Sequence, residues 1–174
     1  MAGSVLSNDM SSMELGGTDI EIRPFRDGDG EAFRLLNEAW IERHFGIEEA
    51  DRKTLGNPEG KVLATGGHIF MAVDGEKAVG CCALILMRPG VFEVAKMTVA
   101  EEYRGRGLGR RLLAHTIEQA RALGAASLYL ETNDKLVDAI HLYEALGFQH
   151  LPPERVTPSP YARANVFMEL AFPD

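Results

Sequence analysis

Apolar and polar residues alternate in several short stretches of this chain, which is the period expected of half-buried β-strands. The turns Asp74-Gly75 and Arg88-Pro89-Gly90 separate three of these stretches and predict an antiparallel meander. The seven predicted strands cover residues 20–24, 68–73, 78–87, 91–99, 127–131, a strand opening at 148, and 164–171. The pattern therefore predicts a sheet as the centre of the fold.

Other stretches place apolar residues three and four positions apart, which predicts amphipathic helices. Four helices are expected, over residues 31–45, 48–55, 108–123 and 136–146. Gly124 and Gly147 follow the last two, where glycine commonly ends a helix. A helical crossover joins strand 91–99 to strand 127–131, so these two strands should be parallel. The expected class is α/β (α+β), with a mixed, mostly antiparallel sheet.

A turn rich in glycine and arginine joins the strand ending at Val99 to the helix that begins at Leu108. It reads Arg104-Gly105-Arg106-Gly107-Leu108-Gly109-Arg110. Such a turn leaves backbone N–H groups unpaired at a helix N-terminus, where the dipole also favours an anion. The glycine spacing fits neither a Walker loop nor the dinucleotide fingerprint. A pyrophosphate is the expected anion, and an ordinary turn with solvated arginines is the alternative.

The spacing Arg104-x-x-Gly107-x-Gly109 resembles the acetyl-CoA loop of the GNAT superfamily of acyl-CoA-dependent N-acyltransferases. A later segment, Asn133 followed by Leu142-Tyr143 and Gly147-Phe148, resembles a second motif of that family. The order of the predicted elements is also similar to the GNAT fold. The resemblance implies about seven strands and about four helices, with the fourth and fifth strands parallel and splayed apart.

The resemblance also implies acetyl-CoA as the co-substrate. Main-chain groups of Met97, Thr98 and Val99 would bind its pantetheine arm where the two parallel strands separate. Asn133 would bond the arm as well, although an Asn that caps the helix ahead of Leu136 is an equally physical account. The residues expected around the cofactor phosphates are Arg104, Gly105, Arg106, Gly107, Leu108, Gly109 and Arg110.

Acyl transfer to an amine needs a base for the amine proton and gains from an acid for the departing thiolate. The resemblance implies that Tyr143 lies near the cofactor sulfur, which makes it the candidate acid. The alternative is a half-buried aromatic residue whose hydroxyl only orders the cofactor.

Glu93 is the candidate base because strand alternation places it on one face with Val91, Ala95, Met97 and Val99. Burial among such residues would raise its pKa. Some GNAT members have a similarly placed glutamate, whereas others use a water chain. A Glu93 that reaches solvent or pairs with an arginine therefore stays open.

Polar residues on the first two helices and before the last strand are candidates for the acceptor site. An acidic pair among Glu48, Glu49 and Asp51 would suit a cationic substrate, with a solvated helix face as the alternative. Tyr161 and Arg163 would reach the same site, and Arg163 would suit a carboxylate.

Composition narrows the class of protein. The 174 residues include 18 Lys and Arg against 26 Asp and Glu, a net charge of −8 that disfavours general nucleic-acid binding. Adjacent Cys81 and Cys82 within an apolar strand predict reduced core residues. The histidine and cysteine spacings predict no metal site, and no apolar run is long enough for a membrane span. We expect a cytoplasmic protein with a flexible extension over 1–17 and one GNAT domain over 18–174.

These features predict an N-acetyltransferase that transfers the acetyl group of acetyl-CoA directly to an amine, most simply that of a small molecule. A non-catalytic acyl-CoA sensor and a protein N-acetyltransferase are the alternatives. The resemblance admits a homodimer. The sequence names neither the acceptor nor the length of the acyl group.

Overall fold

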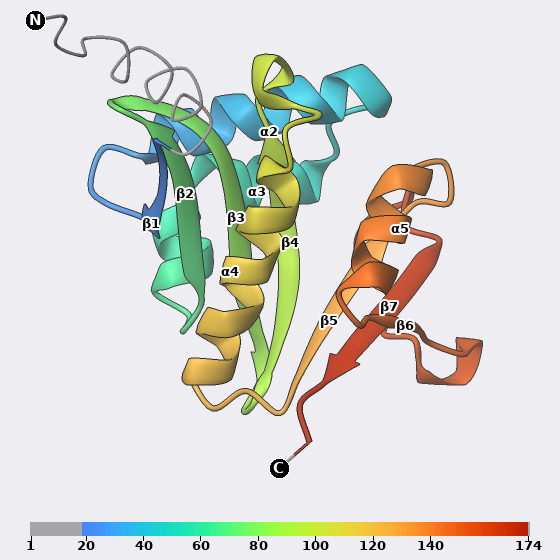
Figure 1. Cartoon of the computed structure of the whole chain (residues 1–174). Helices are drawn as coiled ribbons and strands as arrows, with labels where there is room; N and C mark the ends of the chain where they lie inside the picture. Colours follow the sequence, from blue (N-terminus) through green and yellow to red (C-terminus); the bar gives the residue numbers. More distant parts are fainter. Residues whose placement is uncertain (1–18, 174) are drawn as a thin grey trace, which may run out of the picture.

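Seven strands form one mixed sheet in the order β1-β2-β3-β4-β5-β7-β6 (Figure 1). The computed structural model describes residues 19–173, so the extension expected over 1–17 lies outside the described residues. β4 and β5 run parallel and the other neighbours are antiparallel, as predicted. The strands are β1 (Ile20–Pro24), β2 (His68–Asp74), β3 (Lys77–Arg88), β4 (Val91–Val99), β5 (Ser127–Thr132), β6 (Gln149–His150) and β7 (Val166–Ala171).

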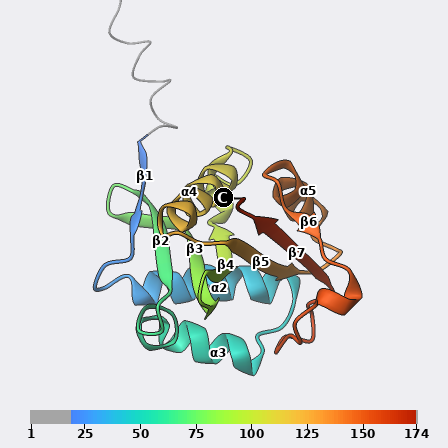
Figure 2. The same ribbon diagram turned by 90° about the horizontal axis from the view of Figure 1, so that it is seen from below.

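Helices cover both faces of the sheet, with α4 and α5 on one side and α2 and α3 on the other (Figure 2). Their bounds are α2 (Gly30–His44), α3 (Glu49–Gly56), α4 (Leu108–Ala122) and α5 (Val137–Ala145). Shorter helical turns lie at Glu101–Tyr103 and Pro153–Arg155. The four predicted helices are confirmed, with small shifts at their ends.

A π-helical turn over Glu59–Leu63 was not predicted, because Asn57-Pro58 favours a break in structure. Pro58 instead stands at the N-cap, where a missing N–H costs no helical hydrogen bond. The Asn57 side-chain oxygen accepts a hydrogen bond from Gly60 N at 3.0 Å and supports the new turn.

The sheet separates two apolar cores, and the adjacent cysteines show how sharply it does so. Cys81 packs with Phe33 and Ile41 of α2, whereas Cys82 packs with Leu112 of α4. Both thiols are free and fully buried, and burial raises the pKa of each. The predicted reduced core cysteines therefore contribute to different cores, because successive strand residues point to opposite faces.

The two parallel strands separate partway along their length. Val91, Phe92 and Glu93 pair with Ser127, Leu128 and Tyr129, and the pairing ends there. Beyond this point β4 and β5 diverge, which leaves a gap in the sheet (Figure 1). The predicted splay is confirmed.

A β-bulge in β4 changes which side chains share a face. Lys96 adopts φ +53°, the one positive φ at a non-glycine residue in the described part of the chain. The register with β3 shifts here, since Cys81 pairs with Thr98 but Ala83 pairs with Ala95. A bulge inserts one extra residue on its own strand and so reverses the alternation beyond it.

The reversal corrects one expectation. Phe92 and Val94 lie in the core under α4, and past the bulge Met97 packs against that same core. Val99 packs beside Leu108, also on the α4 side. The predicted common face of Glu93, Met97 and Val99 is therefore wrong, because strict alternation does not hold across a bulge.

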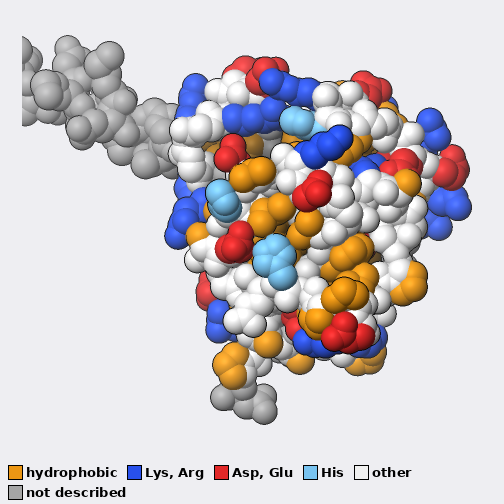
Figure 3. Space-filling view, turned by 90° about the vertical axis from the view of Figure 1, so that its right-hand side faces the viewer, with side chains coloured by type: hydrophobic (Ala, Val, Ile, Leu, Met, Phe, Trp, Pro, Cys, Tyr) orange, Lys and Arg blue, Asp and Glu red, His pale blue; other side chains and the backbone are white. Residues whose placement is uncertain are grey.

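The molecular surface mixes charges of both signs on the face that Figure 3 shows, with apolar side chains gathered toward its centre. Such mixing differs from the single-sign field that attracts nucleic acid. Within residues 19–173 the helices are all too short or too polar to cross a bilayer.

Candidate active site

A cavity of about 270 Å³ lies where β4 and β5 separate, with walls from both faces of the sheet. Trp40, Ile41 and Phe45 line it from the α2 side, and Ala139 and Tyr143 line it from the α5 side. The two strands contribute the edges, from Glu93 to Val99 and from Glu131 to Asn133. The splay thus opens a passage through the sheet.

Glu93 lines this passage at the last position where β4 pairs with β5. Burial, reinforced by the negative charge of Glu131, raises the pKa of Glu93 to about 7, while the Lys96 ammonium opposes the rise. A carboxylate with a pKa near neutrality can accept a proton at physiological pH and release it again. The structure therefore gives Glu93 the protonation behaviour that a general base requires.

Tyr143 lines the same passage but belongs to the opposite face of the sheet. Its ring packs against the core under α4 and meets Phe148 edge-on at 6.0 Å between centroids. Burial raises the pKa of its phenol, so the hydroxyl keeps its proton at neutral pH and can donate it. Two groups predicted by separate arguments, Glu93 from strand alternation and Tyr143 from the family motif, thus reach one cavity from the α2 side and the α5 side.

The glycine-rich turn before α4 presents its backbone outward. Over residues 105–110 the backbone N–H groups have no acceptor within the described part of the protein. Gly105 and Gly107 have φ of +75° and +78°, and Gly107 is the N-cap of α4. Left-handed conformations of this kind strain any residue with a Cβ. The turn fits a pyrophosphate because free N–H groups and the positive end of a 15-residue helix meet there.

Three arginines lie within or beside the run of free N–H groups in the sequence. Arg104, Arg106 and Arg110 are all exposed, and the Arg106 guanidinium lies 5.2 Å from the centroid of the Tyr103 ring. Arg104 lines the cavity while its Nε donates to the Val99 carbonyl at 3.0 Å. Leu108 differs from the others, since its side chain is buried and only its N–H faces the turn.

Main-chain geometry beside the passage follows from the bulge. The Lys96 carbonyl accepts a weak bond from the Cys81 thiol at 3.4 Å, on the β3 side of β4. Because a trans peptide directs its N–H opposite to its carbonyl, the Met97 N–H points away from the Cys81 thiol, which packs on the α2 side of the sheet. Met97, Thr98 and Val99 all line the cavity, as expected of residues that would hold the cofactor arm.

Asn133 lines the cavity too, but its amide is engaged within the protein. Its side chain donates to the Arg163 carbonyl at 2.8 Å and accepts from Lys135 N at 2.9 Å. The N-cap of α5 is Leu136, without a side-chain cap. The capping alternative is therefore not what the structure shows, since Asn133 instead ties the end of β5 to the segment before β7.

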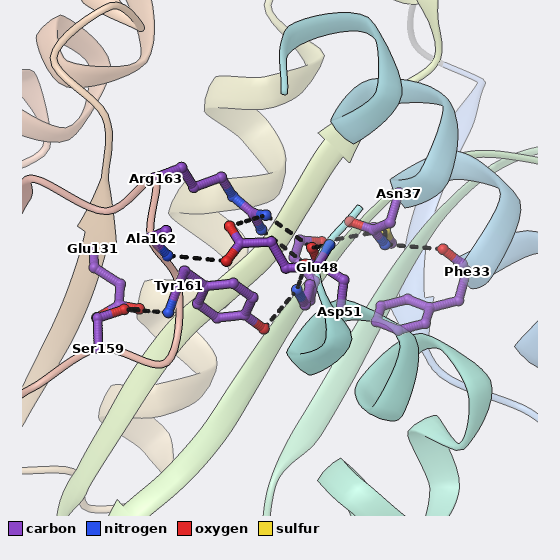
Figure 4. Close-up of polar contacts among 11 residues, drawn as sticks. Phe33, Asn37, Glu48, Asp51, Glu131, Ser159, Tyr161, Ala162 and Arg163 are labelled. Carbon is purple, nitrogen blue, oxygen red and sulfur yellow. Dashed lines mark hydrogen bonds and ion pairs between the residues drawn. The ribbon is translucent and has the colours of Figure 1, made fainter. Parts of the chain in front are cut away.

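The sequence did not predict a buried ion network at the α2 and α3 end of the cavity (Figure 4). Fully buried Asp51 accepts from the Lys96 ammonium at 2.7 Å and from two nitrogens of Arg163 at 2.8 Å each. Glu48 accepts from Arg163 at 3.2 Å and from Ala162 N at 3.0 Å. Lys96 and Arg163 hold the pKa of Asp51 far below its ordinary value, despite burial that opposes the change.

This network revises two ideas about the acceptor. Glu48 and Asp51 are already paired with cations of the protein, so they do not form a free acidic pair for a cationic substrate. Arg163 has its guanidinium on these same carboxylates rather than open for a substrate carboxylate. A lysine within a mostly apolar strand, Lys96, is the signal in the sequence that could have indicated a buried partner.

Within residues 19–173, no three His, Cys, Asp or Glu side chains gather in a way that could hold a metal ion.

Comparison with known proteins agrees with this architecture. Residues 28–148 match the Acetyltransferase (GNAT) family. This chain belongs to that family. Membership confirms the predicted resemblance and the expected enzyme class, an acyltransferase.

Two curated relatives illustrate the range of the family. The uncharacterized N-acetyltransferase YjgM of Escherichia coli is 37% identical over 95 residues, which cover 52% of this chain and 57% of YjgM. The chain thus spans little more than half the length of that relative. Streptothricin acetyltransferase of Streptomyces lavendulae is 40% identical over 156 residues, covering 76% of this chain and 82% of that protein.

Solved structures share the fold. A GNAT-family acetyltransferase from Staphylococcus aureus superposes with a TM-score of 0.79 at 23% identity, over 87% of this chain and 98% of its own. The protein YncA of Salmonella typhimurium, solved with its cofactor acetyl-CoA, has a TM-score of 0.70 at 20% identity, over 89% and 95%. At these identities the similarity shows the fold.

Proposed function

We propose that this protein transfers the acetyl group of acetyl-CoA directly to the amine of a small molecule. The observation that carries the proposal is the passage between β4 and β5, which a candidate base enters from one face of the sheet and a candidate acid from the other. Membership of the GNAT family, which uses acetyl-CoA, supports the same donor.

The donor half is formed by the turn before α4 and the edge of β4. The free N–H groups over 105–110, with Arg104, Arg106 and Arg110 beside them, would hold the pyrophosphate. The arm would then follow the exposed edge of β4 into the passage. The Met97 N–H would donate to the thioester oxygen as negative charge develops on it.

The acceptor half lies on the α2 side, where Glu93 enters the cavity. In the proposed reaction Glu93 takes a proton from the ammonium form of the acceptor, and the amine nitrogen attacks the thioester carbonyl carbon. The C–N bond forms, the C–S bond breaks, and the Tyr143 hydroxyl gives its proton to the departing thiolate. The nitrogen loses its second proton as the amide forms, which returns Tyr143 to the phenol, and the proton on Glu93 passes to water when the product leaves. No covalent bond to the enzyme is needed.

The size and charge of the cavity limit the acceptor. The volume of about 270 Å³ is shared with the thioester end of the donor, so the acceptor is small or enters by a narrow end. Arg163 is held by Asp51 and Glu48, whereas Glu93 and Glu131 face the cavity. We therefore favour an amine without a carboxylate beside it.

Release of free thiol from acetyl-CoA, measured with a panel of amines and amino acids, tests the proposal. Turnover should be faster with an amine than with the amino acid that carries an added carboxylate. Calorimetry with acetyl-CoA supplies the binding constant separately. Binding without thiol release across the panel would favour a non-catalytic sensor, and failure to bind acetyl-CoA would overturn both.

A further inference from the structure

Asp51 joins three segments that are far apart in the sequence. Each of its oxygens accepts two hydrogen bonds: Oδ1 from Lys96 and Arg163, Oδ2 from Arg163 and the Glu48 backbone N–H. These donors belong to β4, to the segment before β7 and to the start of α3. Because the carboxylate is fully buried and all its acceptor sites are used, it is placed to fix these segments relative to one another.

One arm of the network holds the bulge in β4. Lys96 occupies a left-handed conformation that disfavours a residue with a Cβ, and its ammonium is bound to Asp51. The carbonyl of the same residue accepts from Cys81, whose thiol in turn accepts from the Asn37 amide at 3.3 Å. Both ends of Lys96 are thus restrained on the α2 side, and the N–H of the next residue, Met97, points away from the Cys81 thiol.

The other arm holds the segment 159–165, which forms a wall of the cavity. Arg163 reaches Asp51 and Glu48, and its guanidinium lies 4.5 Å from the centroid of the Tyr161 ring. The Tyr161 hydroxyl accepts from Lys96 at 3.0 Å, and Ala162 N donates to Glu48. Figure 4 shows these contacts converging from the loop and from α3.

We propose that Asp51 is a positioning residue for the transfer step. Through Lys96 it fixes the bulge that presents the Met97 N–H to the thioester, and through Arg163 it fixes the wall against which the acceptor rests. The inference deepens the proposed function and rests on it. Asp51 itself touches no substrate, because it is sealed from the cavity by its own cations.

The charges in the network allow a test that separates its two arms. The network contains two carboxylates, Glu48 and Asp51, and two cations, Lys96 and Arg163. The double variant Asp51→Asn with Lys96→Met removes one charge of each sign and releases the bulge, and it also removes the bonds from Asp51 to Arg163 and from Lys96 to Tyr161. The double variant Glu48→Gln with Arg163→Met also keeps the balance, but it releases the wall and leaves the bond from Asp51 to Lys96.

The two variants should fail in different ways. Releasing the bulge should lower kcat by about 10- to 100-fold, because small misplacement of reacting groups costs rate. Releasing the wall should raise the acceptor KM by about tenfold with a smaller change in kcat. The dissociation constant for acetyl-CoA should stay the same in both. Values of kcat are measured on the plateau of the pH profile, where Glu93 is fully deprotonated. A shift in the pKa of Glu93 caused by a changed charge nearby therefore does not alter the comparison.

A surface pair supplies the matched control. Arg34→Met with Glu38→Gln removes a half-buried ion pair of 3.1 Å on α2, outside the cavity, and should leave kcat, KM and acetyl-CoA binding unchanged. The proposal is overturned if both network variants keep wild-type kinetics, or if either weakens acetyl-CoA and acceptor in parallel.

Amide hydrogen exchange keeps the test independent of turnover. Exchange over residues 94–98 should increase only in the variant that lacks Asp51 and Lys96, whereas exchange over 161–165 should increase in both variants. If no amine is acetylated by the wild type, the proposed function fails while this result still reports on the network. Equal exchange over 94–98 in the two variants would remove the positioning role.

Discussion

The donor half and the acceptor half of the cavity are built in opposite ways. The donor half uses backbone N–H groups from one short run, residues 105–110, flanked by exposed arginines. The acceptor half uses side chains from α2, β4, β5 and the segment before β7. A contiguous backbone site leaves a pattern in the sequence, whereas a site assembled by tertiary packing leaves single residues that look ordinary.

The two halves also differ in the environment of their charged side chains. Arg104, Arg106 and Arg110 face water, where an unpaired cation costs little. Asp51 and Lys96 are buried, and each requires the other, since an unpaired buried charge is strongly destabilising. An anionic ligand can therefore bind the arginines of the donor half without breaking any ion pair within the described part of the protein. In the acceptor half the charged side chains already bind one another, so they hold a wall of the cavity in place rather than bind a ligand.

Replacing Tyr143 by Phe should produce the largest effect and affects the chemistry alone. The ring and its packing against Phe148 remain, but the proton donor to the thiolate is lost. We expect kcat to fall by about 10²- to 10⁴-fold, the usual contribution of a general acid, with acetyl-CoA affinity unchanged. Steady-state kinetics and calorimetry give the two values.

Tyr103→Phe is the matched control for Tyr143→Phe. Its hydroxyl donates to Asp74 outside the cavity, so its removal should leave kcat as it is. A Tyr143→Phe enzyme with normal kcat would assign the hydroxyl to cofactor ordering or to no role.

The secondary structure was predictable because local pattern and tertiary fold agree over most of the chain. The strands, the four helices, the parallel pair and the splay follow from alternation, helical spacing and the crossover rule, together with the family resemblance for the splay. The turn over 105–110 was predictable for the same reason, because its glycines are needed by the backbone itself.

The bulge and the ion network could not be predicted in the same manner. Nothing in the alternation of β4 marks Lys96 as left-handed, and the bulge reverses the face of Met97. Asp51 and Arg163 are 112 residues apart, and a single sequence does not reveal such a pairing. Glu93 was identified correctly as lining the cavity, although the reasoning from a shared face with Met97 was wrong.

Glu93→Gln should give an intermediate effect confined to the acceptor half. The pKa of Glu93 is raised to about 7, so wild-type activity should decline as pH falls below neutrality and the base becomes protonated. The glutamine variant should lose about 100-fold in kcat on the plateau and should lack that acidic limb. An acidic limb that persists with normal kcat would favour a water chain as the base.

The same substitution should change stability with a definite sign. A carboxyl whose pKa is raised on folding binds more protons in the folded state between its unfolded value and about 7, so wild-type stability declines as pH rises through this window. The glutamine side chain carries no charge to desolvate. Urea unfolding should therefore show the Glu93→Gln variant gaining on the wild type from about pH 5 to about pH 8. A constant difference would show that Glu93 is not desolvated.

Gly107→Ala should produce the smallest effect and confine it to the donor half. The φ of +78° costs an alanine about 1–2 kcal/mol, while open space around the position leaves no clash to add to it. The unliganded turn of the variant should relax to a conformation without this strain, and binding of acetyl-CoA must then restore the left-handed conformation. Acetyl-CoA affinity should therefore fall by about tenfold. Gly28→Ala, at φ +94° in the open turn before α2, introduces similar strain away from the cavity and should leave that affinity unchanged. Because no side chain of the acceptor half is altered, the acidic limb of Glu93 should persist in Gly107→Ala. A shift of this acidic limb in the pH profile of Gly107→Ala would show that the two halves are coupled through β4.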